Sequence, residues 1–296
     1  MLPCPGAMDV TMSYLQRIEA CNRFDLSRYL PFWVDGVRLG WVLPEFASHL
    51  RAWPNVFEFD DAGVTLAVGL REYAQRSEAV RLVVEQLAGQ GIITGWRNEN
   101  YPVTLNYHQP GAFEVERAAV PHFGFRAFGV HVNGLVRQGN EVKVWVGQRA
   151  KDKPTFPGML DHLAAGGQPV GISQIDNVIK ECGEEAGVPS QLAANAVRVR
   201  DIAYCCDSST GLKPDTMTVF DLYLPESFVP QNTDGEVESF SLWTMDEVAH
   251  VVATTERFKP NCNLVLIDLL MRHGKLGVDS QLALKISGAL LTPELP

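Results

Sequence analysis

Short hydrophobic runs, separated by turn residues, follow one another along the first part of the chain. Residues 31–43 (PFWVDGVRLGWVL) contain two such runs that meet at Asp35-Gly36, a pair typical of a tight type I′ hairpin turn. Residues 56–59 and 64–68 form a second pair around an Asp-Ala-Gly sequence. The pattern therefore predicts two β-hairpins in this region.

A helical pattern follows the hairpins. Ser77 precedes apolar residues at helical spacing and Gly89 follows them, so we expect a helix that Ser77 caps and that ends at Gly89. The polar stretch at 108–111 breaks the pattern and is predicted to be a linker. We therefore expect an amino-terminal α+β domain at 1–118 and a second domain at 119–296.

The second part of the chain alternates extended and helical patterns. Alternating apolar positions predict strands at 125–136, 142–148, 197–206, 216–224 and 238–243. Helical spacing of apolar residues predicts helices at 173–187, 246–253 and 264–273. Strands that surround isolated helices indicate a layered α/β or α+β domain.

The composition is that of an ordinary globular chain, with 296 residues of which 46% are hydrophobic and 20% charged. A net charge of −10 without a basic block argues against a nucleic-acid partner. No apolar run reaches the ~18–20 residues of a membrane helix, so no membrane partner is expected. The first residues carry no export or transit pattern, and the six cysteines form no C-x-x-C pair. These features predict a cytoplasmic protein with buried thiols rather than a disulfide or zinc framework.

Candidate chemistry is concentrated in one segment, AAGGQPVGISQIDNVIKECGEEAGVP at 164–189. Glu181, Glu184 and Glu185 lie within one turn of the predicted helix, on a flank away from its apolar stripe. Lys180 is expected to pair with Glu184, four positions later. Carboxylate oxygens are ligands that Mg²⁺ or Mn²⁺ prefers. The spacing alone leaves two interpretations open, a metal site and a solvated acidic helix face.

The fuller pattern resembles the Nudix box, G-x5-E-x7-R-E-U-x-E-E-x-G-U, in which U is aliphatic. The residues that fall in register are Gly166, Glu181, Cys182, Glu184, Glu185, Gly187 and Val188. Two positions depart from it, because Ile172 stands where the first glutamate is expected and Lys180 replaces the arginine. In the superfamily the first glutamate mainly supports the loop, so its loss bears on loop rigidity more than on hydrolysis.

The resemblance extends to the Nudix subgroup related to thiamine pyrophosphokinase. The matching words are GVHVNG (129–134), KPTFPGMLDHLAAGG (153–167), NTDGEVESF (232–240) and FKPNCNLVLIDLLMRHG (258–274). The region before them looks like the domain that precedes the Nudix domain in that subgroup. The resemblance implies a Nudix α/β/α sandwich with a mixed sheet, preceded by a smaller α+β domain. It also implies a diphosphatase that converts thiamine diphosphate-like compounds, especially damaged oxy- and oxo- forms, to the monophosphate.

The resemblance assigns roles to particular acids. Glu184 and Glu185 are implied to coordinate the metal, and Glu181 is implied to be either a ligand or the base that activates water. The backbone carbonyl of Ala165 is implied to add a ligand, and Glu236 is implied to supply a further catalytic and metal-binding acid from a later loop. The sequence leaves open which glutamate is the base.

Several other residues are candidates for binding the substrate. Arg149, Lys151 and Lys153 follow the strand predicted at 142–148 and could receive the diphosphate, although a solvated basic turn would have the same pattern. The remaining candidates are Gly166, Gly167 and Glu238. The expected partner is a small-molecule diphosphate, and a homodimer is left open.

Three other functions are weighed against this one. A Nudix pyrophosphatase for nucleoside diphosphate-linked substrates would share the metal site and differ in its pocket. A catalytically inactive Nudix ligand sensor would fit the loss of the glutamate at position 172, but not the retention of three crowded acids. An isomerase of the isopentenyl diphosphate type needs a catalytic cysteine in a context that residues 203–207 do not resemble.

Overall fold

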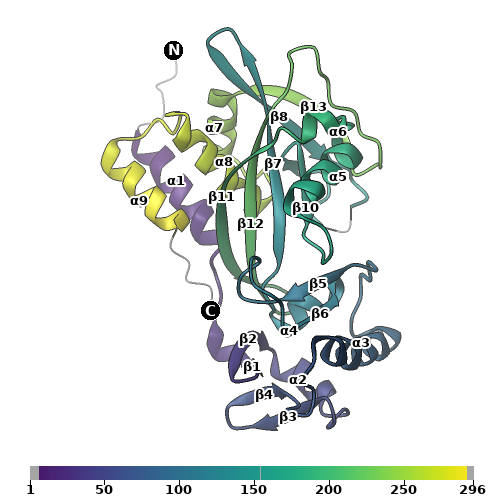
Figure 1. The fold of residues 1–296 in the computed structure, drawn as a ribbon. Coiled ribbons are helices and arrows are strands. Elements are labelled where there is room, and N and C mark those ends of the chain that lie inside the picture. Colours follow the sequence, from purple (N-terminus) through teal and green to yellow (C-terminus); the bar gives the residue numbers. More distant parts are fainter. Residues whose placement is uncertain (1–6, 154, 292–296) are drawn as a thin grey trace.

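The chain has two sheets with a short hairpin between them (Figure 1). The structure is a computed structural model that describes residues 7–153 and 155–291. A four-stranded sheet lies near one end of the molecule, and a seven-stranded sheet lies at the other end. The expectation of an α+β protein with a mixed sheet is confirmed.

Two hairpins form the smaller sheet. Its strands, in spatial order, are β2 (Val37–Val42), β1 (Leu30–Val34), β4 (Gly63–Leu66) and β3 (Phe57–Asp60). Asp35 and Gly36 join β1 to β2 with φ angles of 49° and 77°, the left-handed conformations that a type I′ turn requires. Both predicted hairpins are confirmed.

Helices and a further hairpin complete the amino-terminal core. They are a 3₁₀ turn (Leu26–Arg28), α2 (Pro44–Leu50), α3 (Tyr73–Gly89), β5 (Asn100–Val103), β6 (Phe113–Glu116), a 3₁₀ turn (Arg117–Ala119) and α4 (Val120–Phe123). Residues 108–111 connect β5 to β6, so they do not link two domains. The linker prediction is wrong because a hairpin loop and a linker have the same polar composition.

The start of α3 also differs from the prediction. Glu72 caps the helix and forms a reciprocal capping box with Gln75, so α3 begins at Tyr73. The Ser77 hydroxyl instead donates to the Tyr73 carbonyl at 2.8 Å and accepts from the Glu114 N–H at 3.1 Å. Ser77 therefore joins α3 to β6 rather than capping the helix.

The larger sheet is the scaffold of the second part of the chain. Its strands are β7 (Phe128–Gln138), β8 (Glu141–Arg149), β9 (Leu160–Asp161), β10 (Ala164–Gly167), β11 (Val197–Asp207), β12 (Leu212–Tyr223) and β13 (Val237–Thr244). The main order is β11-β12-β7-β8-β13, while β10 pairs with β7 and β9 pairs with β8. The sheet is mixed, since β7 and β12 run parallel and the other pairs are antiparallel.

Helices cover both faces of this sheet (Figure 1). One face carries α5 (Gln174–Ala186) and α6 (Ser190–Ala193). The opposite face carries α1 (Ala7–Ala20), α7 (Met245–Thr254), α8 (Pro260–Arg272) and α9 (Ser280–Leu291). Helices on both sides of one mixed sheet make an α/β/α sandwich, as expected.

Packing bears on where the chain divides. Tyr14 and Ile18 of α1 are buried in the core that α7 and α8 form, whereas Phe123 and Phe125 are buried in the amino-terminal core. A boundary near residue 118 therefore remains a proposal, and we propose in addition that α1 belongs with the larger sheet. The two parts are in contact at the segment that follows β10, which is described next.

Candidate active site

The acid-bearing helix α5 begins and ends where the sequence predicts. Ser173 Oγ accepts a hydrogen bond from the Asp176 N–H at 3.2 Å, which satisfies a free donor of the first turn. Gly187 has a φ of 62° and its N–H donates to the Gly183 carbonyl at 3.1 Å. The caps fix which side chains of α5 face the glycine-rich loop at 165–173.

Glu185 is buried against that loop. The sequence analysis placed all three acids away from the apolar stripe of the helix, and this is wrong for Glu185, which is only 8% exposed. Its Oε2 accepts a hydrogen bond from the Ala165 N–H at 3.0 Å. Burial raises the pKa of Glu185 well above its usual value, and the carboxylates of Asp161, Glu181 and Glu236 also raise it. A cation bound here would relieve this crowding of negative charge.

Glu181 lies directly over Gly166. A Cβ atom at Gly166 would be 2.1 Å from the Glu181 carboxyl carbon, so Glu181 can keep this position only while residue 166 is glycine. Burial raises the pKa of Glu181, while Lys180 lowers it in part. A carboxylate with a raised pKa is suited to accepting a proton from water near neutral pH.

Glu184 is the most exposed of the three acids. Lys180 Nζ lies 3.1 Å from Glu184 Oε2 and 3.0 Å from Glu181 Oε1, so one ammonium group pairs with two of the acids. The predicted Lys180–Glu184 pair is confirmed. A metal ion that used both carboxylates would have to displace this ammonium group.

The two later acids pair with two of the candidate lysines. The sheet ladder places Val237 opposite Arg149, which brings the start of β13 beside the end of β8. Lys153 forms an ion pair with Glu236, and Lys151 Nζ lies 3.5 Å from Glu238 Oε1. Because the Glu236 carboxylate also raises the pKa of Glu185, the start of β13 lies near the acids of α5.

Arg149 is engaged inside the protein. Its Nη1 lies 2.9 Å from Asp161 Oδ2, and its other nitrogens donate to the carbonyls of Phe156 and Thr155 at 3.2 and 3.0 Å. The side chain is only 11% exposed. In this structure Arg149 therefore holds the backbone at Thr155 and Phe156, while Lys153 pairs with Glu236.

The loop is anchored although Ile172 replaces the expected glutamate. The Ile172 carbonyl accepts from the Tyr107 hydroxyl at 3.0 Å and from Gln168 Nε2 at 2.7 Å. Asn177 Nδ2 donates to the Gly167 carbonyl at 2.8 Å, and the Val170 N–H donates to the Asn100 carbonyl at 2.9 Å. Backbone atoms held by side chains of both parts of the chain thus stabilise the loop.

Replacing Tyr107 with phenylalanine should loosen this loop. The variant loses the bond to the Ile172 carbonyl and leaves Gln168 Nε2 one acceptor short, at a cost of about 1 kcal/mol. Hydrogen–deuterium exchange should become faster across 168–173, and turnover should fall a few-fold. Tyr73→Phe, which removes an exposed hydroxyl on α3, is the matched control. Equal exchange in both variants would show that Tyr107 does not anchor the loop.

The amino-terminal part contributes residues that the sequence analysis missed. A Cβ atom at Gly167 would lie 1.4 Å from the Tyr101 hydroxyl oxygen, so β5 packs directly against the loop. Arg117 Nη1 lies 2.9 Å from Glu99 Oε2, and both side chains act electrostatically on Glu181. No motif marks these residues, because their proximity to Glu181 arises only from packing between the two parts.

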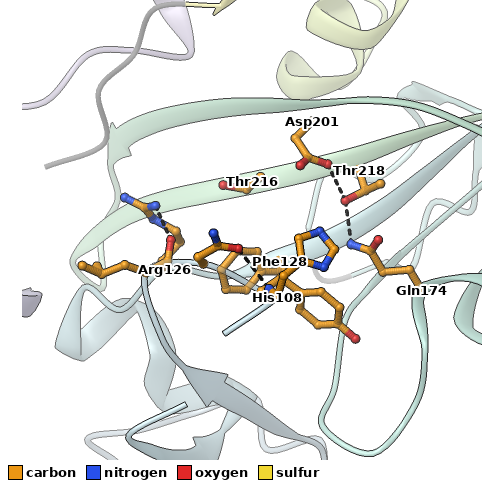
Figure 2. Close-up of a pocket in the computed structure, with 10 residues that line it drawn as sticks. His108, Arg126, Phe128, Gln174, Asp201, Thr216 and Thr218 are labelled. Atoms are coloured by element: carbon orange, nitrogen blue, oxygen red, sulfur yellow. Dashed lines mark hydrogen bonds between the residues drawn. The ribbon is translucent and has the colours of Figure 1, made fainter. Parts of the chain in front are cut away.

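A cavity of about 230 Å³ lies beside the amino-terminal end of α5 (Figure 2). Tyr107 and Phe128 line it with rings, and Asp201 accepts a hydrogen bond from the Thr218 hydroxyl at 2.8 Å. Gln174 Nε2 donates to the same hydroxyl at 2.8 Å. Gln174 and Glu181 share one face of α5, about 10 Å apart along its axis.

The arrangement has the chemistry of a divalent-cation site. Its donors are carboxylate oxygens, which suit Mg²⁺ or Mn²⁺, and the repulsion among them favours a bound cation. Among the described residues, 7–153 and 155–291, the carboxylate oxygens of α5 are farther apart than the ligands of one metal ion. The Lys180 ammonium group lies between Glu181 and Glu184. Acids of one helix placed against a glycine-rich loop on a mixed sheet define a candidate hydrolase for phosphoanhydrides.

Comparison with curated proteins identifies the family. The chain is 41% identical to "Nudix hydrolase 20, chloroplastic" of Arabidopsis thaliana over 286 residues, which cover 93% of this chain and 76% of the relative. It is also 41% identical to "Nudix hydrolase 24, chloroplastic" of the same plant, with the same coverage of both chains. The chain belongs to the Nudix hydrolase family and is an enzyme of that family.

Other comparisons cover parts of the chain or are more distant. A yeast relative, "Uncharacterized protein YJR142W" of Saccharomyces cerevisiae, is 30% identical over 83% of this chain and 78% of its own. Residues 13–127 match a domain family of unknown function, DUF4743. Among solved structures, an Ap4A hydrolase of C. elegans covers 50% of this chain and 98% of its own at 11% identity, with a TM-score of 0.36. The E. coli dihydroneopterin triphosphate pyrophosphohydrolase covers 49% and 95% at 16% identity, with a TM-score of 0.38.

The relatives correct one expectation. The sequence analysis predicted a cytoplasmic protein, and this is wrong, because both plant relatives are named as chloroplastic. The absence of a recognised transit pattern in ten residues is a weak basis for assigning a compartment. In the described part of the chain, no helix has the length and apolar character needed to cross a membrane.

Proposed function

We propose that this Nudix hydrolase is a Mg²⁺- or Mn²⁺-dependent diphosphatase of thiamine diphosphate-like compounds, especially their oxy- and oxo- forms, and yields the monophosphate. The observation that carries the catalytic part is the buried Glu185, bonded to the Ala165 N–H and crowded by other carboxylates. The resemblance to the subgroup related to thiamine pyrophosphokinase supports the substrate class.

The proposed roles are those that the resemblance to the Nudix box implies. Glu184, Glu185 and Glu236, with the carbonyl of Ala165, would hold the divalent ion, which offsets phosphate charge and lowers the pKa of water when bound. Glu181 would accept the proton of the attacking water as the P–O–P bond breaks. Lys153 would release Glu236 and meet the departing phosphate oxygens.

The cavity beside α5 supports a heteroaromatic substrate. The rings of Tyr107 and Phe128 offer stacking surfaces. Asp201 pairs with Arg198 at 2.7 Å and Arg126 also lines the cavity, so a thiazolium would have to compete with Arg198 for the carboxylate. The distance of about 10 Å from Gln174 to Glu181 along α5 suits a ring system joined to a diphosphate by a short chain. Glu99 and Arg117 would lie near a substrate bound at Glu181.

A turnover screen of about twenty diphosphates tests this proposal, with and without Mg²⁺. Chromatography resolves the products, because cleavage of ADP-ribose gives two phosphate monoesters and no free phosphate. Oxythiamine diphosphate should be turned over at least ~10-fold faster than ADP-ribose, and a chelator should abolish turnover. A preference for ADP-ribose would instead support a nucleoside diphosphate pyrophosphatase. Binding of thiamine diphosphate without any hydrolysis, unchanged by the chelator, would support a ligand sensor.

A further inference from the structure

A second group of side chains, apart from the acids of α5, has the features of a metal site. His131 lies on β7, His162 lies between β9 and β10, and Cys262 lies on α8. They are 5%, 4% and 0% exposed. One nitrogen of each ring and the cysteine sulfur lie within 4.8 Å of one another, and among the described residues this is the one such group of three.

Two ring nitrogens in this group lack a partner. His131 Nδ1 and His162 Nε2 are inaccessible to water, and neither makes a hydrogen bond within the described ranges. The two rings pack edge to face, with their centroids 5.1 Å apart. An unpaired buried polar atom costs about 1–3 kcal/mol, so two of them within one group of potential ligands indicate a missing ligand.

Strand alternation separates this group from the acids of α5. Val130 and Val132 belong to the core under α5, so His131 between them points to the opposite face of the sheet. Cys262 belongs to the core on that opposite face. His131 nevertheless pairs in the ladder with Ala165, the residue that bonds Glu185. The group therefore lies behind the acid-bearing loop rather than within it.

Asp161 organises the charges around the group. Its Oδ1 accepts one hydrogen bond from the backbone N–H of His162 and one from the Cys262 thiol, each at 2.9 Å. Its Oδ2 lies 2.9 Å from Arg149 Nη1 and 3.6 Å from Lys259 Nζ. The two cations disfavour a further positive ion, but Asp161 lies between them and the thiol. A cysteine thiolate would add a second negative charge beside the ion.

We propose that His131 Nδ1, His162 Nε2 and Cys262 Sγ bind one Zn²⁺-class transition ion. Two imidazole nitrogens and one thiolate form a donor set typical of zinc, and not of magnesium. The fourth position is left to a water molecule or to Asp161 Oδ1, which is already beside the sulfur. Binding breaks the S–H bond and releases that proton to solvent. The ligand atoms must approach by about 1 Å to reach tetrahedral spacing.

Such an ion would join three elements behind the active-site loop. It would tie β7, the segment between β9 and β10, and the first turn of α8 at one point, and so fix the register of Ala165. The sequence analysis did not predict it, because the three ligands lie far apart along the chain and form no spaced motif. The proposal does not depend on the proposed substrate.

Spectroscopy on untagged wild-type protein tests the site directly. Protein stripped with a chelator and reloaded should retain about one equivalent of Zn²⁺ per chain. X-ray absorption at the zinc edge should show one sulfur at about 2.3 Å and nitrogens at about 2.0 Å. Loading with Co²⁺ should give a thiolate-to-cobalt charge-transfer band. A first shell without sulfur, or no retained metal, would overturn the proposal, and neither measurement requires a variant.

Variants provide a second, independent measurement. Cys262→Ser should lose the charge-transfer band, while Cys206→Ser, a half-buried cysteine outside the group, should keep it. Added Zn²⁺ should raise the melting temperature of the wild type and of Cys206→Ser by about 5 °C. The same shift in Cys262→Ser would contradict the assignment. If Cys262→Ser does not fold, the zinc-edge spectrum of the wild type shows by itself whether a sulfur atom binds the ion.

Discussion

Replacing Glu185 with glutamine is expected to lower turnover by at least ~100-fold, a loss of about 2.7 kcal/mol of transition-state stabilisation. Glutamine has nearly the same shape, and its amide oxygen can still accept the Ala165 N–H, which Glu185 accepts at 3.0 Å. The fold should therefore survive while the negative charge that would hold the cation is lost. Initial rates of phosphate release at saturating Mg²⁺ measure the effect.

Two comparisons sharpen this prediction. Glu184→Gln should also lose at least ~100-fold, because it removes a second carboxylate from the same turn of α5. Glu78→Gln, on the exposed face of α3 where it pairs with Arg81, is the matched control and should retain full activity. If Glu184→Gln and Glu185→Gln both stayed within a few-fold of wild type, these acids would not belong to the site.

Without bound metal, Glu185→Gln should be more stable than the wild type, although its turnover is lower. Because the pKa of Glu185 is raised in the folded protein, the folded state favours the protonated carboxyl, and stability falls as pH rises above the unfolded value of about 4.3. Without metal, Glu185→Gln should melt at a higher temperature than wild type at pH 8, and the difference should vanish near pH 4. Equal melting temperatures at both pH values would contradict the burial of this charge.

Replacing Gly166 with alanine is expected to lower turnover by about 100-fold with little loss of stability. The new Cβ would lie 2.1 Å from the Glu181 carboxyl carbon, so the end of that flexible side chain must move. A displacement of about 1 Å in a catalytic group can cost about 100-fold in rate. The expected loss of stability is small because the clashing atoms belong to the end of a flexible side chain and not to the backbone. Paired measurements of kcat and melting temperature separate the two effects.

Gly183 of the same helix provides the control for Gly166. A Cβ atom there would meet nothing closer than the Val188 carbonyl oxygen at 3.9 Å. Gly183→Ala should therefore keep wild-type activity and gain about 0.5–1 kcal/mol of stability from the better helix former. Loss of activity in Gly183→Ala would mean that the effect of Gly166→Ala is not specific to Glu181.

Local patterns predicted the elements on which the site is built. The caps of α5 are set by Ser173 and Gly187 through contacts with their immediate neighbours, so they could be predicted from spacing. The turn at Asp35-Gly36 likewise depends only on local backbone conformation. The cap at Ser77 was wrong because its hydroxyl is taken by β6, a contact 37 residues away.

Local sequence patterns predict the two hairpins, the strands of the larger sheet and the acid-bearing helix, because each depends on residues that are close together in the chain. The burial of Glu185 and the contacts of Tyr101 and Tyr107 with the loop arise from tertiary packing. Tertiary packing also decided that His131, His162 and Cys262 converge behind that loop. Burial and long-range contact depend on which faces meet when the sheets and helices close, and a linear pattern does not record that.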